Sequence, residues 1–133
     1  MGSVRTNECD EGIRRGRLAK ADQFASAART IVELATEESD VADAYVTLCV
    51  HAGIAASDVI CCARLGRYSR GENHHEAVAL LGRADAGARK HLRVLLDVKT
   101  RSGYSHTPTP LENVRQAGRA MESLLGTAHT LGS

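Results

Sequence analysis

Two side chains suited to acid–base and phosphate chemistry, Arg101 and His106, stand close together in the segment KTRSGYSHTPTP at residues 99–110. A histidine titrates near neutral pH and can move the 2′-hydroxyl proton of RNA, while a fixed arginine stabilises charge developing on the phosphate. About two Arg–His pairs with four to six intervening residues are expected by chance in this composition, and the chain has three. Five positions along a helix turn two side chains ~140° apart, so the pair converges only where a helix ends, as Gly103 predicts.

A second group of cations, Arg64, Arg67 and Arg70, surrounds Tyr68. Guanidinium groups hold phosphate oxygens through charge-assisted hydrogen bonds, and a tyrosine ring can stack on a base. The same residues also suit the solvated carboxyl end of a helix, where the helix dipole favours cations. Both interpretations remain open from the sequence.

The histidines and cysteines lack the spacing of a metal site. His74 and His75 diverge on a helix, and the residues four before and four after His75 are Gly71 and Ala79, whose side chains cannot ligate. The adjacent cysteines Cys61–Cys62 belong to no CxxC motif. We therefore expect neither a metal nor another cofactor.

The cysteines and the ends of the chain indicate a cytoplasmic protein. Adjacent cysteines on a helix have poor geometry for a mutual disulfide, so all four are expected to be reduced core residues. Residues 1–12 show no apolar signal-peptide segment, and no uninterrupted apolar run of ~18 residues predicts a membrane span. The four cysteines are Cys9, Cys49, Cys61 and Cys62.

The apolar residues recur every three to four positions, which predicts an all-α, up-and-down bundle of four to five helices. Aromatics make up only 3% of the chain, so the core must consist of Ala, Leu, Val and Ile. A flexible tail is expected over residues 1–12 and a single helical-bundle domain over 13–128. The expected helices cover about 14–36, 41–65, 74–82, 86–100 and 110–125.

Local signals place the ends of these helices. Gly66 predicts the stop of the second helix, and Asn73 and Asp85 predict the starts of the third and fourth. The pair Thr109–Pro110 predicts the start of the fifth helix, and Gly126 its end.

The net charge of +1 gives no general reason to expect a nucleic-acid-binding protein. Of the 17 basic residues 14 are arginine, which offers a planar, bidentate fork to phosphate. GC-rich codon usage explains the same enrichment without any ligand.

The order of the segments VADAYVTLCVHAGIAASDVICCARLG, GENHHEAVALL, LRVLLDVKTRSGYSH and TPLENVRQAGRAMESLL resembles the HEPN family over about residues 40–125. The resemblance implies a compact homodimeric bundle. In many members an Arg-x4-6-His motif cleaves RNA without metal, often as the toxin of a toxin–antitoxin pair. The resemblance would assign Arg101 and His106 to that motif. A related branch of HEPN-like proteins instead has a Lys…Tyr element, which Lys99 and Tyr104 match here.

Three hypotheses follow. The favoured one is a HEPN-like homodimeric module that binds RNA, a nucleotide or a protein partner through Arg64, Arg67, Arg70, Lys99 and Tyr104. The alternative is a metal-independent ribonuclease of toxin type using Arg101 and His106 across the dimer, with an antitoxin or nucleotidyltransferase as partner. The third is a dimerisation bundle without a ligand, which a small-residue seam on the second helix would support.

Overall fold

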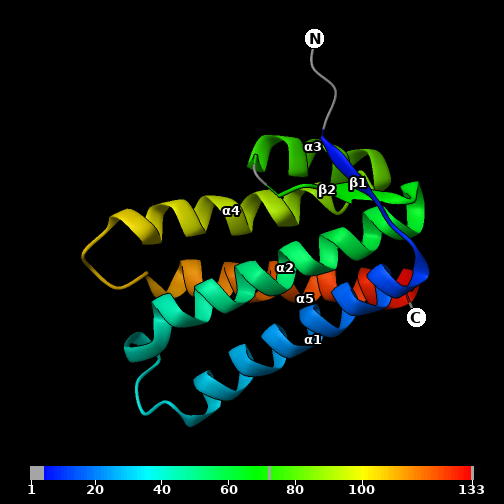
Figure 1. The fold of residues 1–133 in the computed structure, drawn as a ribbon. Helices are drawn as coiled ribbons and strands as arrows, with labels where there is room; N and C mark the ends of the chain where they lie inside the picture. The colour runs from blue at the N-terminus through cyan, green and yellow to red at the C-terminus, as the bar shows by residue number, and fades with distance from the viewer. Residues whose placement is uncertain (1–4, 72, 133) are drawn as a thin grey trace.

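A computed structural model describes residues 5–71 and 73–132, apart from the side chains of Gly103 and Tyr104. The described residues form a helical bundle with one small two-stranded sheet (Figure 1), which confirms the predicted all-α architecture. The elements in chain order are β1 (Thr6–Glu8), α1 (Glu11–Leu34), a 3₁₀ turn (Glu38–Val41), α2 (Ala42–Leu65), β2 (Arg67–Ser69), α3 (His74–Ala84), α4 (Arg89–Tyr104) and α5 (Leu111–Gly132).

Helix α2 is the centre of the bundle (Figure 1), with contacts to all four other helices. Its small residues allow this close packing: a Cβ added at Gly53 would overlap the Leu95 side chain of α4. The segment Glu38–Leu65 is long and apolar enough to cross a membrane by length and composition. Because 72% of its most apolar window is buried inside the bundle, α2 has the burial of a core helix in a soluble protein.

The small-residue seam of α2 is occupied by helices of the same chain. Gly53 meets α4, while Tyr45 of α2 lies against Gly118 of α5, where an added Cβ would come 2.5 Å from the tyrosine oxygen. The seam therefore does not supply a surface for a second copy, and the predicted homodimer rests on the family resemblance alone.

The local start and stop signals mostly predicted the right positions. The Asn73 side chain accepts hydrogen bonds from the amides of His75 and Glu76, and Gly66 has the left-handed φ of 69° that ends α2. Helix α5 continues past Gly126 to Gly132, so the predicted stop was wrong. It continues because Ala128, two residues further on, is fully buried in the core.

The flexible tail predicted for residues 1–12 is replaced, from Thr6 onwards, by ordered structure. Strand β1 pairs antiparallel with β2, with Asn7 opposite Tyr68, and α1 begins at Glu11. Its N-cap is Asp10, whose carboxylate accepts a hydrogen bond from the Ile13 amide at 2.8 Å. A strand of three residues is too short for the periodicity of the sequence to reveal. Its partner strand also lies about 60 positions away along the chain.

A disulfide joins Cys9, between β1 and α1, to Cys62 in the last turn of α2. The prediction that all cysteines are reduced was therefore wrong for this pair, while Cys49 and Cys61 are free and buried. The strand pairing explains the bond, since it brings the two Cα atoms to 5.5 Å across a sequence separation of 53 residues. The argument from cysteines for a reducing compartment loses its force.

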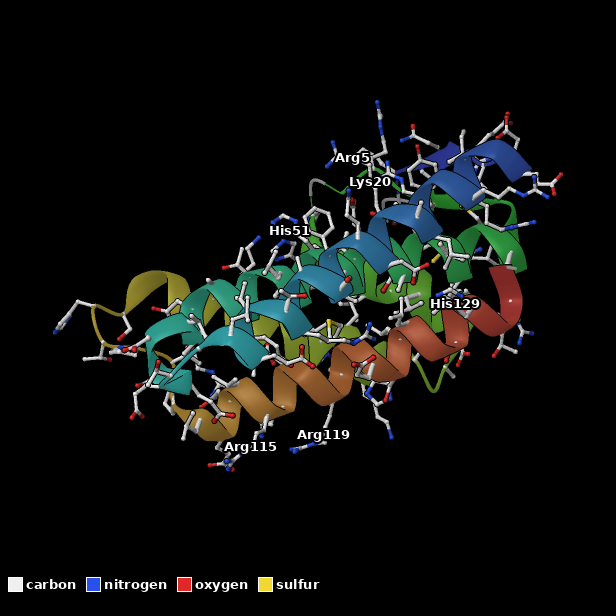
Figure 2. The ribbon with its side chains drawn as sticks, turned by 90° about the horizontal axis from the view of Figure 1, so that it is seen from below. Arg5, Lys20, His51, Arg115, Arg119 and His129 are labelled. Carbon is white, nitrogen blue, oxygen red and sulfur yellow. A yellow bond between two sulfur atoms is a disulfide. The ribbon has the colours of Figure 1, made fainter. Side chains whose placement is uncertain are left out.

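A side-chain contact joins α1 to α5. The His129 Nε2 atom of α5 lies 2.6 Å from the Asp22 carboxylate of α1 (Figure 2). One face of α5 remains outside this contact, and Arg115 and Arg119 extend from it away from the bundle (Figure 2).

Candidate functional site: a cavity around Asp58

A cavity of about 170 Å³ lies where the antiparallel ribbon of β1 and β2 meets α1, α2, α3 and α4. We call it the Asp58 cavity. Positions 54, 58 and 61 of α2 share one helical face, which places Ile54, Asp58 and Cys61 in its lining. Leu92 and Leu96 of α4 complete an apolar wall. The cavity therefore combines an apolar wall with an acidic group.

The Asp58 carboxylate is buried, with a relative exposure of 9% for the residue. No hydrogen bond from the described part of the chain reaches it. The nearest charged group is the Nε atom of Arg17, at 3.8 Å from Oδ2, which is beyond hydrogen-bonding distance. A buried polar group without such partners is costly, so this carboxylate is an acceptor that the fold leaves open toward the cavity.

Burial raises the pKa of Asp58 to about 7, against the opposing effect of the Arg17 charge. The carboxyl group is consequently close to half-ionised at neutral pH. Its hydrogen-bonding capacity changes with protonation, because an ionised carboxylate only accepts while a protonated one also donates.

Arg17 is held in place from the ribbon side. Its guanidinium lies 5.1 Å from the centre of the Tyr68 ring, within the range of a cation–π contact. Tyr68 is on β2, and β2 is itself fixed by its pairing with β1. The antiparallel ribbon thus positions Arg17, which among the described side chains is the only cation close to Asp58.

Two further basic residues, Arg70 and His74, line the same cavity and are exposed. Gly71 lies between them with a φ of 83°, a conformation that residues with a side chain rarely adopt. Its amide donates to the Ser69 hydroxyl at 3.2 Å. This turn brings the end of β2 and the start of α3 to one rim of the cavity.

The potential nucleophiles of the cavity are not activated. The Ser57 hydroxyl donates to the carbonyl oxygen of Gly53, one turn earlier, at 2.8 Å. Burial raises the pKa of the Cys61 thiol to about 12, so the reactive thiolate is scarcely populated at neutral pH. The described lining is suited to binding more than to covalent chemistry.

The Arg101 and His106 pair lies elsewhere, at the α4–α5 connection. Both side chains are exposed, and no hydrogen bond joins them within the described residues. Arg101 lines a separate cavity of about 280 Å³ together with Ser102 and Pro108, whereas His106 does not. Thr109, which follows, is buried and donates through its hydroxyl and its amide to Asp43 of α2, which anchors this connection.

The remaining predicted ligand residues are dispersed. Arg64 is exposed on the last turn of α2, while the Arg67 Nε donates to the Thr6 hydroxyl at 2.6 Å and so braces the ribbon. Lys99 is exposed beside a wider surface hollow that also includes His74. Tyr104 ends α4, and its side chain lies outside the described ones. Of the group around Arg64, Arg67 and Arg70, the residues Tyr68 and Arg70 line the Asp58 cavity.

In the described part of the chain, no three histidine, cysteine or acidic side chains lie close enough together to hold a metal ion. His74 and His75 instead open α3, as the sequence suggested.

Sequence reasoning missed the centre of this site, Asp58 with Arg17. A signal was present, since Asp58 is the only acidic residue between Asp43 and Glu72, inside the apolar stretch GIAASDVICCA. Acidic residues are seldom fully buried without a partner, so an aspartate on a core helix deserved as much weight as the Arg–His spacing.

The chain matches no known family model, no curated protein and no solved structure. The residues and their geometry therefore carry the functional conclusions that follow.

Proposed function

We propose that this chain is a HEPN-like helical module that binds a nucleotide in the Asp58 cavity without catalysing a reaction. The observation that carries the proposal is a buried carboxylate that borders a cavity and receives no hydrogen bond from the described residues. A ligand with N–H donors would supply the missing bonds, and the edges of nucleobases carry such donors.

The size and lining of the cavity support a base as the inserted group. A cavity of about 150 Å³ is known to accommodate a single six-membered ring, and this one measures about 170 Å³, so the six-membered ring of a base would enter edge first and a fused second ring would stay at the mouth. Ile54, Leu92 and Leu96 provide apolar surface for the ring faces. The sugar and phosphate of the nucleotide would remain outside the cavity.

The charges at the rim suit that outer part. Arg70 and His74 are exposed where a phosphate would lie, and a guanidinium can hold phosphate oxygens in a bidentate manner. The proposal therefore assigns base recognition to the buried Asp58 and phosphate binding to the exposed Arg70.

The HEPN assignment and the homodimer belong to the same proposal. The order and lengths of the helices support the first, and the resemblance of the sequence supports the second. The Cys9–Cys62 disulfide argues against a strongly reducing environment.

Nucleotide titration by calorimetry tests the proposal. We expect nucleoside monophosphates to bind, and Arg70→Ala to weaken binding by about 10- to 100-fold, because one charge-assisted contact is lost. Arg64→Ala is the matched control, since Arg64 is also an exposed arginine near the end of α2 but does not line the cavity. Absence of binding at about 1 mM nucleotide, or equal losses in the two variants, would refute the proposal.

The alternative function is a metal-independent ribonuclease that uses Arg101 and His106 across a dimer. The exposure of both side chains favours it, because a site shared between two chains requires accessible groups. A comparison of RNA degradation by the wild type and His106→Ala distinguishes the two functions. We expect neither protein to degrade RNA above the buffer rate, whereas activity lost in His106→Ala would establish the ribonuclease.

A further inference from the structure

The open hydrogen-bonding capacity at Asp58 has a defined pattern. The carboxylate carries two acceptor oxygens side by side and, when ionised, no donor. Arg17 lies beside Oδ2 at 3.8 Å, which leaves both oxygens without a hydrogen bond from the described residues. A ligand that satisfies this group must present two adjacent donors.

Among the common bases, guanine presents two adjacent donors on its Watson–Crick edge, at N1 and at the 2-amino group. Adenine and cytosine place a ring acceptor beside their amino group, and uracil places carbonyl acceptors on both sides of its single N–H. We infer that the Asp58 cavity is a guanine-recognition site in which the Asp58 carboxylate accepts from N1–H and the 2-amino group. This inference rests on the proposed nucleotide binding and names the base.

Burial of the Asp58 carboxylate makes the discrimination between guanine and the other bases strong. A base that turns a ring nitrogen lone pair toward a largely desolvated carboxylate loses one hydrogen bond and adds repulsion between two acceptors. Sites built to hydrogen-bond a particular group reject analogues that lack it by large factors. We expect guanine to be favoured over adenine by about 100-fold.

Protonation of Asp58 reduces the preference. The protonated group offers one donor and one acceptor, which matches adenine and cytosine better than guanine. Burial raises the pKa of Asp58 to about 7, so the change falls near neutrality. The other titratable or charged groups facing the cavity are Arg17 from α1, Cys61 from α2, Tyr68 from β2, Arg70 and His74.

His74 at the rim would meet the phosphate of every nucleotide alike. The ratio of guanine to adenine affinity therefore isolates the effect of Asp58. We expect this ratio to fall by about 10-fold or more between about pH 8 and pH 6.

The guanine may come from a free nucleotide or from single-stranded RNA, and both present the same edge. The experiment uses GMP, AMP and IMP, which is GMP without the 2-amino group, and short single-stranded RNAs with and without one guanine. At about pH 8 we expect GMP to bind about 100-fold more tightly than AMP and about 10-fold more tightly than IMP. A guanine-containing RNA that binds more tightly than GMP would identify RNA as the source, whereas equal affinities would identify the free nucleotide.

The decisive variant is Asp58→Asn, which keeps the shape but presents one acceptor and one donor. We expect it to lose the guanine preference and to bind AMP at least as well as GMP. Asp97→Asn removes the same charge from an exposed position on α4 outside the cavity and should change neither affinity. If Asp58→Asn fails to fold, the comparison of GMP with IMP on the wild type still tests the second hydrogen bond.

The possible failures are distinguishable. Equal affinities for GMP, IMP and AMP, with the loss in Arg70→Ala retained, would leave nucleotide binding intact and overturn guanine recognition. A guanine preference that persists in Asp58→Asn would overturn the role of Asp58. No binding of any nucleotide would overturn both the proposed function and this inference.

Discussion

The β1–β2 ribbon and the α4–α5 connection lie at opposite ends of the bundle (Figure 1), and the charged side chains at the two ends differ in burial. At the ribbon end, Asp58 and Arg17 come from different helices, and the fold buries the carboxylate beside a cavity. At the α4–α5 connection, Arg101 and His106 are neighbours in sequence but both remain exposed, and only Arg101 lines a cavity there. Proximity in the sequence is thus no evidence of a shared site, whereas burial of the Asp58 carboxylate disfavours its charged form and raises its pKa.

The largest expected effect concerns the disulfide that closes the ribbon end. We expect Cys9→Ser to lower the free energy of unfolding by about 2–4 kcal/mol, because the Cys9–Cys62 bond constrains the unfolded chain over 53 residues. Urea unfolding with and without reductant measures the difference. Reductant should destabilise the wild type and leave Cys9→Ser unchanged; equal sensitivity of the two proteins would contradict the disulfide.

The next effect is the pH dependence that Asp58 gives to the free energy of unfolding. Its pKa of about 7 in the folded chain lies above the value of about 4 in the unfolded chain, so the folded state holds a proton that the unfolded state releases. This contribution is present at low pH and is lost as the pH rises from about 4 to about 7.

We therefore expect the free energy of unfolding of Asp58→Asn to exceed that of the wild type by on the order of 3 kcal/mol above about pH 7. Near pH 4 this difference should disappear. Urea unfolding at several pH values tests it. The exposed variant Asp97→Asn should show no such pH-dependent difference. A constant gap between Asp58→Asn and the wild type would mean that Asp58 is not a buried, titrating group.

A smaller effect tests the packing that the two ends share through α2. We expect Gly53→Ala to destabilise the fold by about 1–3 kcal/mol, because its methyl group would overlap Leu95 in a core without free space. Gly16→Ala is the control, since nothing lies within 4 Å of a Cβ at that exposed helical position and alanine favours the helix. Thermal unfolding measures both variants, and equal stabilisation of the two would show that α2 and α4 are less tightly packed than described.

The features that the sequence predicted are those set within one or two helical turns. The helical periods, the Asn73 cap and the Gly66 stop depend on neighbouring residues, and each was confirmed. The start predicted from Asp85 was early, because α4 begins at Arg89 and the Asp85 side chain instead accepts from the amides of Gly87 and Ala88 in the turn before it.

The features that escaped prediction depend on contacts between distant residues. The Cys9–Cys62 bond spans 53 positions, and Arg17 and Asp58 meet only because α1 packs along α2. Short-range spacing carries no information about such pairs. The isolated acidic residue in an apolar helix was the sequence signal that pointed to the buried centre of the cavity.

The most direct test of the central claim compares nucleotide affinity in Arg70→Ala and Arg101→Ala, two exposed arginines at the two ends of the molecule. If the ligand binds at the Asp58 cavity, Arg70→Ala weakens binding by about 10-fold or more and Arg101→Ala leaves it unchanged. The reverse pattern, with binding lost in Arg101→Ala and retained in Arg70→Ala, would contradict the account and move the site to the α4–α5 connection.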